Sequence, residues 1–236
     1  MRILRDCTRD KFKYKEIISD QLFQYLENLA ISKGTNLDYL FLTVITAVNF
    51  ILAKARCKVD LRGQDFSQWL CNLNTYSIFV GPPTTNKSGV LEFALVKPFN
   101  DKNLDIHVVN KPTTSALAQA LGDAETDHAV ILENSEISEL LASNISNSKD
   151  SYTGDISLLN KIYSGEQVKQ IFSTRQNDDI PADSVLCIIG KIIHFIFHKN
   201  CAILADLRDF YHHLFLTRFL YGRRDQNSVF FCFFMI

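Results

Sequence analysis

The segment with the clearest capacity for chemistry is residues 81–88, GPPTTNKS. Gly81, Lys87 and Ser88 follow the spacing G-x-x-x-x-G-K-[ST], and Asn86 stands where the second Gly is usual. In loops of this pattern, backbone N–H groups surround phosphates, the Lys contacts the β- and γ-phosphates and the hydroxyl binds Mg²⁺. The second Gly position often needs a positive φ, which Asn adopts more readily than most residues. We therefore expect the loop to close around phosphate.

This pattern predicts a nucleotide site with ATP as its ligand and Mg²⁺ bound at Ser88. The alternative is a proline-rich turn between a strand and a helix that matches the pattern without binding phosphate. The residues assigned to the nucleotide are Gly81, Pro82, Pro83, Thr84, Thr85, Asn86, Lys87 and Ser88.

Hydrolysis would also need an acidic residue at the end of a neighbouring strand, to hold the metal or polarise water. The expected strand 128–132 is followed by Glu133 and, three residues later, by Glu136. Either carboxylate could take the catalytic role, and Glu136 could also serve as a ligand of Mg²⁺. Alternatively both are solvated, with Glu136 in the first turn of a helix, where the helix dipole favours acids.

The elements that must position these residues follow from hydrophobic periodicity. A β-branched and aromatic strand (75–80) precedes the loop, and a helix closed by Pro98 follows it. Beyond them strands alternate with helices, which favours a mostly parallel sheet covered on both faces. The predicted fold is α/β, with a helical lead-in at 1–65 and the sheet domain at 66–236. Expected helices are 16–33, about 38–55, 87–96, 115–121, 137–142 and 156–163, and expected strands are 58–62, 75–80, 104–109, 129–132, 167–173 and 184–190.

Composition restricts the class of protein. With 236 residues, 47% of them apolar and 22% charged, the chain is expected to be globular. The formal charge of -1 gives no indication of a nucleic-acid partner. Six scattered cysteines and a charged beginning (1–15) favour a reduced, intracellular protein. The apolar run 39–53 is expected to be a buried core helix, with no membrane partner, and the apolar tail 229–236 either a buried strand or an unnatural terminus.

Several stretches, taken in order over about residues 17–222, resemble a P-loop ATPase family of prophages, plasmids and other mobile elements. Much of that family is described as a domain of unknown function, near superfamily-3-like, primase-associated helicases. The stretches are QLFQYLENLAISKGTNLDYLFLTVITAVNFILA, SIFVGPPTTNKSGVLE, NKPTTSALAQAL, AVILENSEISELL, LLNKIYSGE, SVLCIIG and LTRFLYGRR.

The resemblance implies a P-loop NTPase-type sheet and an ATP-binding, ATP-hydrolysing, helicase-like or DNA-replication-associated protein. It matches Glu136 to the family's acidic residue and places Ser135 where an Asp is usual. Arg218 matches the Arg of the closing element, which implies either an arginine finger in a homo-oligomer or an ordinary surface arginine. The polar residues that should follow Gly190 are replaced by KIIH, beginning at Lys191.

Two functions therefore stay open at this point. One is the ATPase, with nucleotide and single-stranded nucleic acid as partners. The nucleic acid would bind at a patch of Arg218, Tyr221, Arg223 and Arg224, which is alternatively only a solvated charged end. The other is a non-catalytic remnant that serves as an interaction or nucleic-acid-binding module. Three features favour the remnant: Asn86, Ser135 and the end of the chain soon after LTRFLYGRR. The sheet domain would then be truncated at its carboxyl end.

Overall fold

The structure is a computed structural model of the whole chain. It describes residues 13–60, 70–81, 84–103, 107–108, 114–123, 127–134, 152–170, 178–193, 217–220 and 229–235. Pro82, Pro83, Ser135, Glu136, the expected helix 137–142 and residues 221–224 lie outside the described residues.

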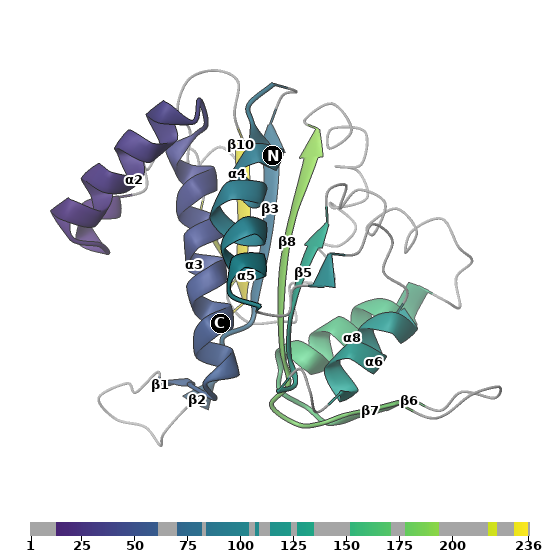
Figure 1. Cartoon of the computed structure of the whole chain (residues 1–236). Helices are drawn as coiled ribbons and strands as arrows, with labels where there is room; N and C mark the ends of the chain where they lie inside the picture. Colours follow the sequence, from purple (N-terminus) through teal and green to yellow (C-terminus); the bar gives the residue numbers. More distant parts are fainter. Residues whose placement is uncertain are drawn as a thin grey trace.

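A mixed six-stranded sheet forms the centre of the molecule (Figure 1). Its order is β4-β5-β8-β3-β10-β9, so the strand before the loop lies in the interior of the sheet. The pairs β4–β5, β5–β8 and β8–β3 are parallel, whereas β10 is antiparallel to β3 and β9 is antiparallel to β10. The predicted α/β class with a parallel sheet is confirmed in this coarse form. The strands are β3 (Thr75–Gly81), β4 (His107–Val108), β5 (Ala129–Asn134), β8 (Val185–Ile193), β9 (Thr217–Leu220) and β10 (Val229–Met235).

The apolar tail adopts the strand conformation that the sequence left open. β10 pairs with β3 from Val229↔Val80 to Phe233↔Tyr76. A continuous apolar run suits a strand beside the centre of a sheet, where both faces can be covered.

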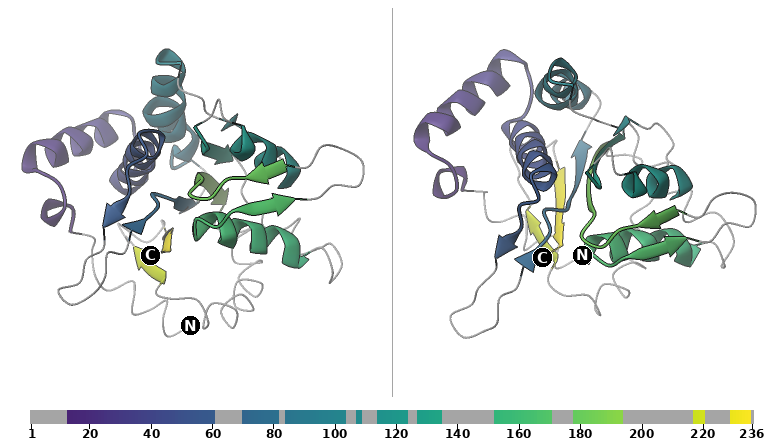
Figure 2. Two further views of the ribbon diagram at one scale, coloured as in Figure 1. Left: turned by 90° about the horizontal axis from the view of Figure 1, so that it is seen from below. Right: turned by 60° about the horizontal axis from the view of Figure 1, so that its bottom comes forward.

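Helices cover both faces of the sheet (Figures 1 and 2). On one face lie α3 (Leu37–Lys54) and the helical run of α4 (Lys87–Leu91), η2 (Glu92–Val96) and α5 (Lys97–Asp101). On the other lie α6 (Thr114–Gly122) and α8 (Tyr152–Tyr163). A short antiparallel pair, β6 (Val168–Gln170) and β7 (Asp178–Ile180), packs beside α6, and a second pair joins β1 (Val59–Asp60) to β2 (Leu70–Cys71).

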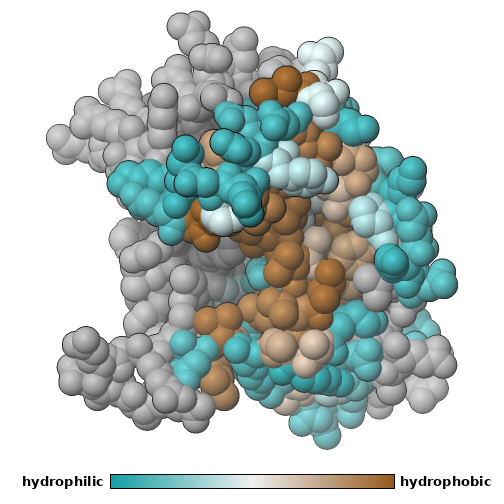
Figure 3. All heavy atoms as spheres, turned by 60° about the vertical axis from the view of Figure 1, so that its left-hand side comes forward, coloured by the Kyte–Doolittle hydropathy of each residue, from teal (hydrophilic) through white to brown (hydrophobic). Residues whose placement is uncertain are grey.

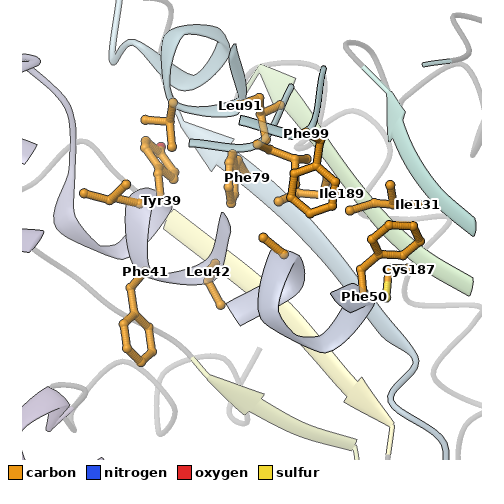
Figure 4. Close-up of a cluster of buried hydrophobic side chains, with 14 of the residues drawn as sticks. Tyr39, Phe41, Leu42, Phe50, Phe79, Leu91, Phe99, Ile131, Cys187 and Ile189 are labelled. Atoms are coloured by element: carbon orange, nitrogen blue, oxygen red, sulfur yellow. The ribbon is translucent and has the colours of Figure 1, made fainter. Parts of the chain in front are cut away.

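Alternation along β5 and β8 divides the core into two clusters. Ile131 and Ile189 belong to the cluster under α3 and α4, which also holds Phe79 and Leu91 (Figure 4). Their strand neighbours face α6 and α8, among them Val130, Leu132, Leu186 and Ile188. Since side chains alternate between faces, Glu133 and Lys191 continue the α4 side of the sheet.

The two helices of the lead-in each begin at a side-chain cap. Ser19 Oγ accepts a hydrogen bond from Leu22 N, so α2 (Asp20–Ser32) starts after Ser19, later than the predicted residue 16. Asn36 Oδ1 accepts from Asp38 N at 2.8 Å and caps α3. A single turn, η1 (Tyr14–Glu16), precedes α2.

The long apolar helix α3 packs against the sheet. Its buried threonines Thr43 and Thr46 donate to backbone carbonyls four residues earlier, which satisfies their hydroxyls inside the core. By length and composition α3 also passes for a membrane span, but it is slightly more than half buried, as core helices often are. Seen from the side of α2 and α3, apolar side chains form a band on the surface (Figure 3). The exposed apolar residues of these two helices include Ile31, Val48, Ile51 and Leu52.

The prediction that Pro98 ends the helix after the loop is wrong. The helical run continues through Pro98 to Asp101, because η2 is a π-helix in which Lys97 N donates to Glu92 O, five residues earlier. Pro98 has no N–H to donate, and the wider π turn accommodates it where a regular α-helix would clash.

Candidate functional site

The loop residues lie at the carboxyl edge of the parallel strands, which points to the top of Figure 1. In the register of the sheet, Gly81 lies opposite Ile193 and Asn134 opposite Gly190, so β3, β5 and β8 end close together. The crevice outside the carboxyl ends of such strands is where open α/β sheets bind ligands. The sequence-predicted residues Lys87, Ser88 and Glu133 all come from this edge.

The loop backbone has the conformation that the sequence predicted for Asn86. Asn86 is left-handed, with φ 52° and ψ 34°, so the residue in place of the second Gly adopts the positive φ. Thr84 also has a positive φ of 78°, which is costly for a β-branched residue. Strain of this kind persists where the surrounding structure enforces it, and it concentrates at functional sites.

The Asn86 side chain anchors the loop to the helical lead-in. Its Nδ2 donates to the Lys33 carbonyl, at the end of α2, at 2.7 Å. The amide lies over Gly89, where an added Cβ would overlap Asn86 Oδ1. The same side chain makes no capping bond to α4, so it leaves the first N–H groups of this helix for another acceptor. An Asn at this position thus adds an anchor that a Gly lacks.

Lys87 is the first residue of α4, and only 7% of its surface is exposed. Its ammonium donates to Thr85 Oγ1 at 3.1 Å, which keeps the side chain folded back over the loop. Burial lowers the pKa of Lys87, and the charge of Lys191 lowers it further. Both effects make the ammonium costly in the free protein, and a phosphate anion would relieve both.

Glu133 is the carboxylate that the structure brings to this edge, on β5 and with 8% of its surface exposed. Burial raises its pKa, Lys191 opposes the shift, and Glu92 of η2 adds to it. A carboxyl group with a raised pKa is suited to accept a proton from a water molecule. Of the two carboxylates to which the sequence gives this role, Glu133 lies at this edge and Glu136 lies outside the described residues, so the role stays a prediction for both.

The functional residue that sequence reasoning missed is Lys191. β8 runs past the predicted end at Gly190 to Ile193, with Lys191 opposite Phe79 of β3. The Lys191 ammonium donates a hydrogen bond to Ser88 Oγ. The available signal was the single charge within the apolar stretch 185–193, two residues beyond the buried Ile189, which places it on the α4 side of the sheet.

Other predicted site residues are not brought to the loop within the described chain. Arg218 lies on β9 opposite Phe234, one residue beyond the pair Phe219↔Phe233, and Phe233 in turn pairs with Tyr76 near the amino end of β3. Pro82 and Pro83 carry no backbone N–H, so neither can donate one to a phosphate, although the sequence pattern assigns both to the nucleotide. Glu136 and the patch at Tyr221, Arg223 and Arg224 lie outside the described residues.

The predicted Mg²⁺ site at Ser88 stays a prediction, and the structure places a competing cation beside it. Ser88 Oγ, the predicted ligand, already accepts a hydrogen bond from a cation, the Lys191 ammonium. Within the described ranges no group of three or more His, Cys, Asp or Glu residues converges on a metal-sized space. Mg²⁺ demands near-octahedral oxygen ligands at short distance, and a neighbouring ammonium opposes its approach.

Comparison with protein-family models finds no match to this chain. Comparisons with curated proteins and with solved structures likewise find no significant similarity. The site is therefore interpreted from its own geometry.

Proposed function

We propose that this chain binds a nucleoside triphosphate, with ATP as the expected ligand, through its phosphates at the loop 81–88. The observation that carries the proposal is the pairing of a left-handed Asn86 with a buried Lys87 at the first position of the following helix. This is the backbone and side-chain arrangement expected of a phosphate loop. Its position at the carboxyl edge of the sheet supports the same function.

Electrostatics at the edge favour an anion with several charges. The Lys87 and Lys191 ammoniums act on each other strongly enough to lower the pKa of Lys87, in addition to its burial. A polyphosphate placed against both would replace this repulsion with attraction. Binding of the polyphosphate should therefore also raise the free energy of unfolding of the chain.

A second candidate function is nucleotide binding without hydrolysis, as in the remnant predicted from the sequence. The hydrogen bond from Lys191 to Ser88 favours it, because Ser88 is the hydroxyl that hydrolysing enzymes of this pattern use for Mg²⁺. The competing hydrolytic function would use Glu133, or Glu136, to orient water. Phosphate release by the wild-type chain in the presence of Mg²⁺ separates the two functions. The helicase-like and nucleic-acid-binding roles stay predictions from the resemblance.

The test of nucleotide binding is a calorimetric titration of ATP into the wild type and into Lys87→Met. The matched control is Lys97→Met, which removes an exposed lysine ten residues further along the same helical run. We expect Lys87→Met to weaken binding by about a hundredfold, since it removes charged hydrogen bonds to phosphate, and Lys97→Met to leave the affinity unchanged. Equal affinity of the wild type and Lys87→Met would overturn the proposal.

Thermal unfolding of the same variants shows whether a loss of binding is caused by a loss of the folded structure. Because the pKa of Lys87 is lower in the folded chain than its ordinary 10.5, carrying the charge costs stability at neutral pH. That cost disappears only as the pH rises through 10.5. Lys87→Met should therefore be at least as stable as the wild type at neutral pH while it no longer binds ATP.

A further inference from the structure

The starting observation is the place that Lys191 occupies. It lies on β8 on the same side of the sheet as Glu133 and directly faces the start of α4, where its ammonium donates to Ser88 Oγ. Ser88 follows Lys87 in the loop, so two lysines from distant parts of the chain meet at the same turn.

The second observation is that Lys191 also acts on the carboxylate of this edge. The positive charge of Lys191 opposes the rise that burial imposes on the pKa of Glu133. The ammonium thus donates to a hydroxyl oxygen, and its charge acts on a carboxyl group. These are the two kinds of protein ligand that a phosphate-bound Mg²⁺ takes at the end of such a sheet.

A lysine ammonium and Mg²⁺ have the same sign and attract the same oxygens, so one excludes the other from this position. The ammonium donates N–H groups to the oxygens, whereas the metal accepts their lone pairs at shorter distance. With Lys191 in place, an incoming polyphosphate already meets a second cation beside Lys87. A metal would have to displace this ammonium from Ser88 before it could bind there.

We propose that Lys191 takes the place of the magnesium ion, so that the loop binds metal-free nucleoside phosphates. The inference rests on the proposed function, since it concerns how the same loop holds its nucleotide. Lys191 would then determine whether the loop binds the free nucleotide or its magnesium complex. The free polyphosphate, which carries more negative charge than its magnesium complex, becomes the preferred ligand.

The test is an ATP titration with excess EDTA and a parallel titration with excess Mg²⁺. The proteins are the wild type, Lys191→Met and a control, Lys169→Met, which removes an exposed strand lysine on β6. For the wild type and the control we expect binding in EDTA to be at least as tight as with Mg²⁺. For Lys191→Met we expect about a tenfold loss in EDTA, and recovery when Mg²⁺ is added, because the metal can then reach Ser88 and Glu133.

The wild-type titrations decide the question even if Lys191→Met does not fold. Wild-type binding that is about tenfold tighter with Mg²⁺ than with EDTA would overturn this inference and leave nucleotide binding intact. Equal losses with and without Mg²⁺ in a folded Lys191→Met would also overturn it, since the variant would then lack only a general attraction. Failure of the wild type to bind ATP in either buffer would refute the proposed function, and this inference with it.

Discussion

The two edges of the central sheet carry different kinds of buried polar group. At the amino edge these groups are neutral: Asn74, Thr75 and Ser184 are all buried where the strands begin. At the carboxyl edge the buried groups are the ionisable Lys87 and Glu133, and Lys191 lies beside them. One sheet therefore has one edge built of amides and hydroxyls and another built of charges.

The amino edge meets its hydrogen-bonding needs within the chain. Asn74 Oδ1 accepts from Leu186 N at 2.7 Å, and Asn74 Nδ2 donates to the Tyr163 carbonyl at 3.1 Å. Asn49 of α3 donates to Thr75 Oγ1 at 2.7 Å. A network of this kind joins β3, β8, α3 and α8 and specifies how they assemble.

At the carboxyl edge, unlike the amino edge, burial disfavours the charged forms of the polar groups. Its buried lysine has a lowered pKa and its buried glutamate has a raised one, so each pays for desolvation in the free chain. Perturbed ionisable groups of this kind cluster at functional sites. The comparison indicates that the amino edge contributes stability, whereas the ionisable groups of the carboxyl edge lower it in the free chain, as the proposed binding site would lead us to expect.

The largest effect on stability is expected from a substitution in the hydrogen-bond network of the amino edge. Asn74→Ala removes the partner of the Leu186 N–H and of the Tyr163 carbonyl, and it should lower the free energy of unfolding by about 2 kcal/mol. Urea denaturation measures the change, with the exposed Asn100→Ala as the control. ATP affinity under native conditions should not change, because Asn74 lies at the other end of β3. A variant as stable as the wild type would contradict the role given to this network.

A smaller effect of opposite sign is expected at the carboxyl edge. Since the folded pKa of Glu133 is raised above its ordinary 4.5, the cost to stability grows as the pH rises above 4.5 and is complete once the pH exceeds the folded value. Below 4.5 the group is neutral in both states and the cost vanishes. Glu133→Gln should therefore be more stable than the wild type by about 1 kcal/mol near neutral pH.

The control for this prediction is the pH dependence itself. The advantage of Glu133→Gln should fall to nearly zero at about pH 4, measured by urea denaturation at each pH. An advantage that stays constant across this range would show that the variant acts through packing and not through charge.

The smallest expected effect concerns the anchor of the loop. Asn86→Ala must place an ordinary side chain in the left-handed region and should cost about 1 kcal/mol, in addition to its lost bond to Lys33. Asn86→Gly keeps the backbone conformation and loses only the anchor, so its cost should be smaller, a few tenths of a kcal/mol. Thermal unfolding of the two variants measures the difference. If Asn86→Gly proves the less stable of the two, the anchor matters more than the backbone.

Local features of this chain could be predicted from its sequence. The strand before Gly81 and the positive φ of Asn86 each depend on a few neighbouring residues, and such preferences act through short-range sterics and hydrogen bonds. The helix continuing through Pro98 escaped prediction because a π turn of five residues relieved the clash on which the rule depends.

Long-range placement was decided by the tertiary structure. Lys191 stands 103 residues after Ser88, and no local pattern indicates that the two meet. Only the parallel pairing of β3 with β8, and the extension of β8 past Gly190, bring this lysine to the loop.

The sequence by itself determined a phosphate-loop pattern and the conformations of the segments around it, because those depend on the chemistry of adjacent residues. The tertiary structure decided which charges surround that loop: Glu133 and Lys191 on the α4 side, Arg218 toward the other end of the sheet. The physical reason is that strand order and register are set by burial summed over the whole core, and every side chain at the edge is placed by that sum.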